Sequence, residues 1–258
     1  MKPLRFATAA LAVMTVLAAC SGDSSGPSVA GRQVAFQLAT KPSTAAPGQA
    51  ALVGQEINVA GSDTIVVTSV QLVLRQIELE RTSPAVVCDT SAAVEDSCEE
   101  LKLGATLLDL PLGAGAQHDF TVAIDTGSYS KVKFEIYKPS SGDDSAFVAQ
   151  NPGFEGVSVQ MTGTYNGTAF TYTSDLDVEQ EYSFNPPLTV TEAAGANITL
   201  FVDLNSWFLN QTADGLIDPL TANGGGTFEG EVKSNIESSF NAFEDDNHDG
   251  EDDHGTGS

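Results

Sequence analysis

Apolar side chains recur at every second position through much of this chain, and this alternation limits the fold more than any other feature. The clearest segment is SKVKFEIYK, in which Val132, Phe134 and Ile136 share one face. Successive side chains of a β-strand point to opposite faces of a sheet, so the pattern predicts strands with one buried face. The same alternation appears in three further segments, residues 33–40, 119–124 and 197–204.

A slip in the alternation marks one irregular point in a long predicted strand. Apolar residues alternate from Val70 to Leu74 and resume one residue out of phase at Ile77. One extra residue would turn the later side chains to the opposite face unless the strand bulges. The sequence therefore predicts a β-bulge near Arg75 and Gln76.

Two dipeptides mark where strands turn or stop. Asn166-Gly167 lies between two alternating runs and is the strongest short signal for a β-hairpin, because both residue types tolerate a positive φ. The pair Pro186-Pro187 lacks the amide donors that a central strand needs, so it predicts a break in the strand around it.

Helical periodicity is confined to one segment near the C-terminus. Val232, Ile236, Phe240 and Phe243 recur at helical spacing, which places them on one face of a helix. Many short strands and one late helix predict an all-β fold: an antiparallel β-sandwich with one short C-terminal amphipathic helix. We assign this domain to residues 32–243.

The first residues have the composition of a bacterial export signal. Lys2 and Arg5 precede an uncharged apolar run that is too short to span a bilayer, and the sequence Leu-Ala-Ala-Cys follows, ending at Cys20. This stretch resembles the lipobox of bacterial lipoproteins. The resemblance implies a signal peptide over residues 1–19, acyl chains on the cysteine and a flexible tether over residues 20–31. The alternative is an ordinary secretory leader with a chance cysteine.

The residue after the cysteine bears on localisation. It is Ser rather than Asp, which by resemblance to Gram-negative lipoprotein sorting implies the outer membrane of the cell envelope, on its periplasmic or surface face. The membrane would then be a partner through the N-terminal acyl chains.

Two further cysteines remain. Cys88 and Cys98 flank a polar loop, and an even pair in an exported chain predicts a disulfide. Two free thiols or a metal pair are the alternatives, although the spacing matches no zinc pattern and no histidine lies near.

The chain is strongly acidic, with a net charge of −24. The seven acidic residues after Phe243 account for only part of this charge. Without that tail and the leader, 28 acidic residues still stand against 9 basic ones. A body of this sign repels nucleic acid and anionic headgroups, so a nucleic-acid partner is not expected. Cations and basic partners are favoured, or the charge serves solubility alone.

The tail, residues 244–258, contains the opening of a calcium loop. Oxygen-bearing side chains at alternate positions, followed by a glycine that permits a sharp turn, are typical of such loops. The twelfth position is Thr256, where an EF-hand needs a bidentate Glu, so we expect at most weak calcium binding and no other cofactor. The alternative is a disordered, solvated acidic tail. The candidate metal ligands are Asp245, Asn247, Asp249, Glu251 and Asp253.

Residues 33–138 carry a second resemblance. The segments VQLVLRQIEL, LLDLPLGAG and GSYSKVKFEIYK are similar to a β-sandwich domain of bacterial lipoproteins whose function is uncharacterised. The resemblance implies a prealbumin-like or immunoglobulin-like sandwich and implies no reaction.

Catalysis is not expected. The predicted domain, residues 32–243, has no Gly-x-Ser-x-Gly motif and holds a single histidine, His118. We interpret the protein as a non-enzymatic binding or structural module with a glycan or an envelope protein as partner. The alternative is a carbohydrate- or calcium-dependent adhesion module. The candidate ligand-binding aromatics are Tyr165, Tyr172 and Trp207, and the last of these is better explained as a residue that plugs one end of the sandwich.

Overall fold

The computed structural model describes residues 33–41, 54–82, 103–113, 117–246 and 252–253. Within this part of the chain, no helix is long and apolar enough to cross a membrane. Six residues with predicted roles lie outside the described residues: Cys20, Cys88, Cys98, Asn247, Asp249 and Glu251.

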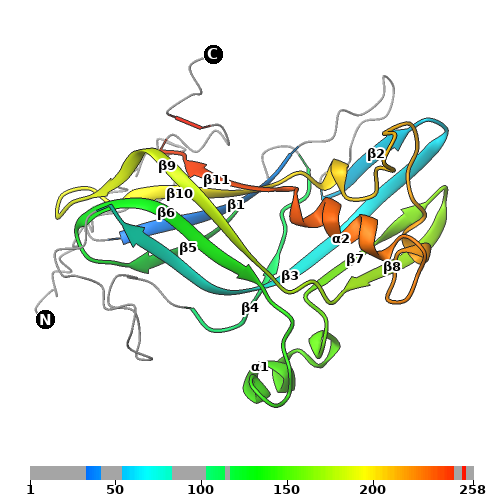
Figure 1. Ribbon diagram of the computed structural model, residues 1–258, viewed down its shortest axis with the longest axis horizontal. Helices are drawn as coiled ribbons and strands as arrows, with labels where there is room; N and C mark the ends of the chain where they lie inside the picture. Colours follow the sequence, from blue (N-terminus) through cyan, green and yellow to red (C-terminus); the bar gives the residue numbers. More distant parts are fainter. Residues whose placement is uncertain (1–32, 42–53, 83–102, 114–116, 247–251, 254–258) are drawn as a thin grey trace, which may run out of the picture.

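The described strands form two sheets, which confirms the all-β sandwich (Figure 1). The smaller sheet has the order β11-β10-β1-β5, and β1 pairs with β10 in parallel. An entirely antiparallel sandwich was therefore too narrow a prediction. Parallel strands need a long crossover between them, and most of the chain lies between these two. The four strands are β1 (Gln33–Thr40), β5 (Gln117–Ala123), β10 (Ala196–Val202) and β11 (Phe240–Glu244).

The larger sheet is built on the long strand β3 (Asp63–Arg81). Residues shared between the registers place β2 and β4 along one edge of β3 and β7 and β6 along the other. Strands β8 and β9 pair with the outer edges of β7 and β6. The bounds are β2 (Glu56–Ala60), β4 (Thr106–Asp109), β6 (Gly127–Ile136), β7 (Val159–Tyr165), β8 (Thr168–Ser174) and β9 (Val178–Val190).

The predicted bulge lies where the sequence places it. The register of β3 on β6 shifts between Arg75 and Glu78, and Gln76 has a φ of 52°. The shift restores the inward phase, because Ile77 and Leu79 are both buried. The strand thus stays amphipathic on both sides of the slip.

The hairpin is confirmed, whereas the strand does not break at the prolines as predicted. Asn166 and Gly167 join β7 to β8 with φ values of 48° and 80°. Strand β9 continues past the prolines, but its pairing with β6 skips from Ser183 to Leu188. Proline has no amide donor, and both prolines lie in a stretch of this outer strand that is not paired with β6. Their missing donors therefore cost no hydrogen bond of the sheet.

The C-terminal helix is shorter than predicted. Helix α2 (Glu229–Glu237) buries Val232 and Ile236, whereas Phe240 and Phe243 belong to β11. Strand β11 pairs with β10, and Phe240 packs its ring 5.9 Å from Phe134. Pairing with a sheet edge satisfies the backbone of this segment better than one more helical turn would.

A second helix was not predicted. Helix α1 (Ser145–Gln150) and a 3-10 turn, Pro152–Phe154, stand apart from the sheets (Figure 1). They pack on Val73 and Tyr137 as a small apolar cluster, separate from the main core.

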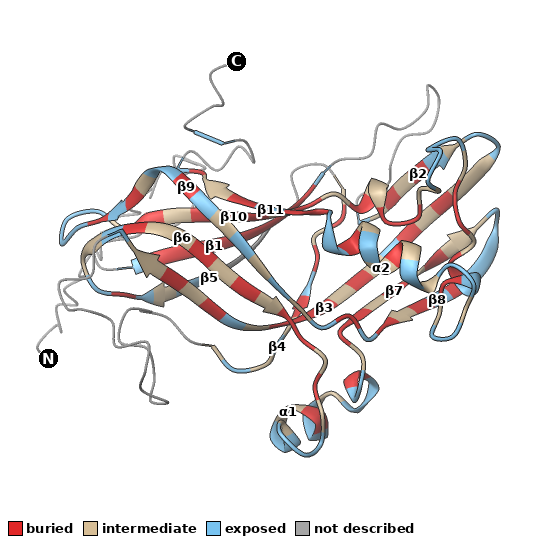
Figure 2. Cartoon of the chain, in the orientation of Figure 1, coloured by how far each residue is buried: buried red, intermediate tan, exposed pale blue. Residues whose placement is uncertain are grey.

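The main core runs through both halves of the molecule (Figure 2). In one half, β6 and β9 face the smaller sheet, as the contact of Phe134 with Phe240 shows. In the other half, β7 and β8 are covered by α2 and the segment before it, where Phe208 packs edge-on to Tyr172 at 5.2 Å. In this half, the larger sheet is therefore covered by α2 and loops rather than by a second sheet.

Candidate functional site

Three segments meet at one end of the molecule: the β2–β3 turn, the β7–β8 turn and residues 203–217. The two turns are joined by Asn166, whose Oδ1 accepts the Thr64 amide at 2.9 Å and whose Nδ2 donates to Asp63 Oδ1 at 3.0 Å. In Figure 1 this is the right-hand end, beside the tips of β2 and β7. The end is held by side-chain hydrogen bonds rather than by the sheet alone.

The third segment is a short closed loop. Asp214 Oδ1 accepts from Asn210 Nδ2 at 2.8 Å and from the Thr212 hydroxyl at 2.6 Å. Hydrogen bonds from these two side chains lower the pKa of Asp214. Gly61 has a φ of +61°, and a Cβ there would lie 2.6 Å from the Asp214 carbonyl oxygen. Only glycine permits this approach of the loop to the β2–β3 turn.

Beside this loop lies a cavity of about 250 Å³, which we call the end cavity. Apolar residues of β2 and of segment 203–217 form much of its wall, and Lys41, another lining residue, has a 2.8 Å ion pair to Asp203. The lining residues are Lys41, Ile57, Asn58, Val59, Asn205, Leu209 and Leu216.

Asn58 is the distinctive residue of the end cavity. Its side chain is only 4% exposed, and its Nδ2 donates to the Leu204 carbonyl at 3.1 Å. Its Oδ1 is buried and has no hydrogen-bond partner among the described residues. A buried acceptor left unpaired costs about 1–3 kcal/mol, and most buried polar atoms in native proteins are paired. A buried, unpaired acceptor therefore belongs to one of the residues that line the end cavity.

Sequence reasoning missed Asn58 and the closed loop. A signal was present in EINVA, where the polar residues Glu56 and Asn58 occupy alternate positions, both of them buried. Polar residues on the inward face of a strand are uncommon unless they are paired or used.

Two of the predicted ligand-binding aromatics are not available to a ligand. Trp207 and Tyr172 are fully buried. The Trp207 Nε1 donates to the Ser239 hydroxyl at 2.8 Å, and burial raises the pKa of Tyr172 to about 12. Both are core residues, because a stacking platform needs an exposed ring face.

Tyr165 has a different place. It is half-buried, and its hydroxyl donates to the Leu216 carbonyl at 3.4 Å. Burial, and after it the charge of Asp63, raise the pKa of this phenol. Tyr165 thus supports the wall of the end cavity from outside and does not line it.

The acidic tail begins on ordered structure. Asp245 is fully buried, its backbone amide donates to Asn197 O at 3.1 Å, and its carboxylate accepts from the Thr199 hydroxyl at 2.8 Å. The prediction that the chain becomes a solvated tail at 244 is wrong for this residue. Pairing with β10 thus fixes the backbone at the residue that was predicted as the first ligand of a calcium loop.

The other end of the predicted calcium loop returns to the same place. The Asp253 amide donates to Glu244 O at 3.2 Å, and the Asp246 amide donates to Asp253 Oδ2 at 2.5 Å. Asp253 therefore lies beside Glu244 and Asp246, the chain neighbours of the predicted ligand Asp245. Within the described ranges, no three His, Cys, Asp or Glu side chains lie close enough to hold a metal ion.

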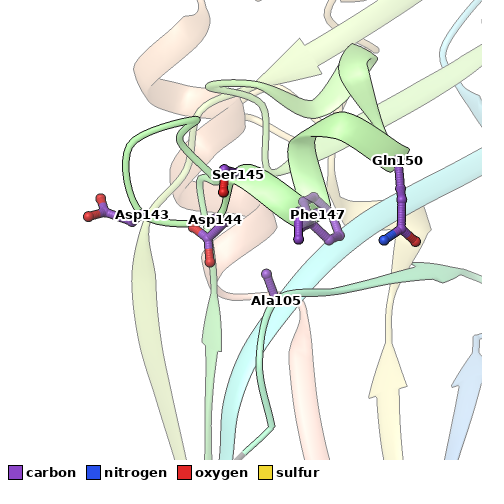
Figure 3. Close-up of a pocket in the computed structure, with 7 residues that line it drawn as sticks. Ala105, Asp143, Asp144, Ser145, Phe147 and Gln150 are labelled. Carbon is purple, nitrogen blue, oxygen red and sulfur yellow. The ribbon is translucent and has the colours of Figure 1, made fainter.

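A larger hollow of about 400 Å³ lies beside α1 (Figure 3). Asp144, which lines it, accepts the Tyr137 hydroxyl at 2.5 Å, and Arg75 lies 3.5 Å above the Tyr137 ring. Burial, and then this hydrogen bond, raise the pKa of Tyr137 to about 12. Asp143 points away from the other lining residues (Figure 3). These groups stabilise the attachment of α1 and leave little for a ligand.

The fold defines the chain as an all-β sandwich protein with a polar, loop-built end. A solved structure, MbnP from Methylosinus trichosporium, is similar at 11% identity, covering 70% of this chain and 78% of that one with a TM-score of 0.37. A similarity at this level carries no argument about function.

No family model matches the chain, and no curated protein matches it. The resemblance of residues 33–138 to the lipoprotein sandwich domain therefore stays a prediction, as does the lipobox at Cys20.

Proposed function

We propose that this protein is a non-enzymatic binding module of the bacterial cell envelope, anchored to the outer membrane through Cys20, that takes a small polar ligand into the end cavity. The observation that carries the proposal is the end cavity itself, a hollow of about 250 Å³ lined by aliphatic side chains together with Lys41, Asn58 and Asn205. Pockets that bind small molecules combine apolar walls with a few fixed polar groups, and the end cavity has this composition.

The binding site is tested with ¹⁵N-labelled full-length protein carrying Cys20→Ser, which removes acylation and leaves the sandwich unchanged. A set of small neutral molecules with hydrogen-bond donors is titrated in. We expect saturable shifts of the Asn58 side-chain amide and the Val59 backbone amide. Shifts confined to residues that line the hollow beside α1 would show that the molecules bind there and not in the end cavity.

The anchor is tested separately, because it rests on the sequence alone. Wild-type protein should fractionate with membranes and take up a palmitate analogue, and the Cys20→Ser protein should do neither. If the wild type takes up no palmitate analogue, the protein is secreted without an acyl anchor and the lipoprotein prediction is wrong.

Calcium-dependent adhesion is the second candidate, and the closure of the tail on β11 favours it. Asp245 is held at the end of a paired strand, and Asp253 returns beside it, with its amide donating to Glu244 O and its carboxylate accepting the Asp246 amide. Fixed entry and exit reduce the entropy that ordering the loop would cost. The incomplete ligand set still limits affinity to a dissociation constant of about 10⁻⁴–10⁻³ M.

Calorimetry with calcium on the intact protein and on Asp253→Asn decides this candidate. We expect weak binding to the intact protein that the variant loses, with magnesium as the control ion. Identical heats of calcium binding for both proteins would show that the tail is not a calcium site.

A further inference from the structure

We propose that the sandwich holds a second binding site, a cavity between its two sheets that takes an uncharged, single-chain aliphatic molecule. We call it the edge cavity. Its volume is about 330 Å³, and it shares no lining residue with the end cavity. The residues that line it are Leu74, Ile77, Leu103, Thr106, Leu107, Leu108 and Phe120.

The edge cavity lies where both sheets end. Its lining comes from β3, β4 and β5, and among the described strands β4 pairs only with β3 and β5 only with β1. Phe120 of β5 is registered opposite Phe36 and stacks on its ring, with the centroids 5.2 Å apart. Because Phe36 is fully buried in the main core, this contact holds the Phe120 ring on the inner face of the smaller sheet.

The β-bulge gives the cavity two apolar residues of β3. Leu74 and Ile77 are three residues apart, which would place them on opposite faces of a regular strand, yet both are buried in the main core. The amide of Gln76, inside the bulge, donates to Leu103 O at 3.0 Å and so holds the segment that begins at Leu103 beside them. Bulges are over-represented next to active sites, because they redirect side chains.

The side chains of the remaining wall face the same side, with one exception. Leu108 belongs to the main core, and Leu103 packs against it. Thr106 lies two residues before Leu108 in β4 and therefore shares its face. Leu107 is the exception, because its side chain packs against the separate cluster beside α1, on the opposite face. The wall is thus made of inward-facing side chains of both sheets, with β4 contributing backbone at Leu107.

This wall has the chemistry of a site for hydrocarbon. Among the described residues, none that lines the edge cavity carries a charge, and its one side-chain hydroxyl, on Thr106, already donates to Gly104 O at 2.9 Å. A charged group on a ligand would therefore lose its water without gaining a charged partner. The net charge of −24 adds repulsion for an anionic head group. An uncharged aliphatic chain meets neither cost.

The volume sets the length of the chain. An apolar cavity of about 150 Å³ binds benzene, and the edge cavity is about 330 Å³. It therefore holds a chain of about eight to twelve carbons. Leu74, Ile77 and Leu108 are buried, whereas Thr106 is exposed, so the lining extends from the core to the surface. A chain can then bury its carbons and keep a terminal hydroxyl in water.

The experiment titrates 1-butanol, 1-hexanol and 1-octanol into the full-length Cys20→Ser protein, labelled with ¹³C at its Ile and Leu methyl groups. We expect saturable shifts of the Ile77 and Leu103 methyl signals and an affinity that rises about fourfold for each added CH₂. Octanoate, a charged probe of the same length, should bind about tenfold more weakly than 1-octanol, or weaker still. An affinity that stops rising before 1-octanol overturns the chain length, and equal binding of octanoate overturns the uncharged class. If no alcohol shifts these signals saturably, the edge cavity is not a binding site.

Variants test whether the alcohol lies in the edge cavity. Leu103→Trp enlarges a half-buried side chain of the wall and should weaken 1-octanol binding by about tenfold or more. Leu209→Trp is the matched control, because Leu209 is a half-buried leucine of the end cavity, and it should leave 1-octanol binding unchanged. If Leu103→Trp does not fold, Thr106→Phe gives the second measurement, since its exposed position tolerates a larger side chain, and the same loss is expected. Binding of 1-octanol that persists in these edge-cavity variants, or that is lost only in Leu209→Trp, contradicts the proposed site.

Discussion

At the scale of single residues, Gly163 shows how little space separates β7 from β3. A Cβ at this position would lie 2.1 Å from Val66 O and 3.1 Å from Val66 C, both backbone atoms. A register shift of β3 on β7 occurs at the same place, between Val67 and Ser69. The local backbone therefore has no room for a side chain unless the two strands move apart.

Gly163→Ala should lower the free energy of unfolding by about 2–4 kcal/mol, because relief of the clash disturbs a central pair of strands. Gly153→Ala is the control, since its added Cβ meets no described atom within 4 Å. Urea unfolding followed by tryptophan fluorescence measures both, with Trp207 as the only tryptophan. Equal midpoints for the two variants would contradict the clash.

At the scale of elements, the sequence predicted those features that depend on near neighbours. The bulge after Arg75 and the turn at Asn166-Gly167 follow from local alternation and from φ preference, and both were found. The end of α2 was missed because the spacing of Phe240 fits a helix as well as a strand. Only its partner β10, about 40 residues away, decides between them.

The end cavity was beyond sequence prediction for the same reason. Asn58 and Leu216 come from segments that are far apart in the chain. Alternation in EINVA indicates that Asn58 faces inward, but nothing near it in sequence states whether its acceptor finds a donor. That answer depends on where Leu204 and its neighbours pack.

Helix α2 is tied to the β8–β9 turn by Lys233, which contacts Asp175 at 2.5 Å and Glu229 at 2.6 Å. Hydrogen bonds from Lys233 lower the pKa of both carboxyl groups from their ordinary values of 3.8 and 4.5. A lowered folded-state pKa means that the contribution to stability is present above the ordinary values and is lost as the pH falls through the folded-state values.

Lys233→Met should therefore be slightly less stable than the wild type near neutral pH, and this difference should vanish at acid pH. Thermal unfolding over a pH series measures it. Lys138→Met is the control, because its ion pair with Asp175 is longer, at 3.7 Å, and should matter less. A difference that grows as the pH falls would contradict the sign of these shifts.

At the scale of the whole molecule, the net charge of −24 opposes compactness. Like charges on a folded surface repel one another, and added salt screens them beyond about 8 Å at physiological ionic strength. Ions that bind at fixed carboxylates, such as Asp245 and Asp253, should add to this general effect.

The melting temperature should therefore rise with sodium chloride, and it should rise further in calcium chloride of equal ionic strength. A protein truncated after Asp246 keeps β11 but loses Asp253, and it should respond equally to the two salts. An equal response of the intact protein would assign the whole effect to screening.

Strand β1 has a mechanical consequence for any force that enters through the residues before Gln33. The strand lies between β10 and β5, with seven registered pairs on each side. A pull along its axis loads these pairs together in shear, instead of opening them one after another as at the end of a hairpin. Detachment of β1 then requires that two hydrogen-bond ladders break at the same time. A chain held at its N-terminal end is therefore attached through a strand that is paired on both sides.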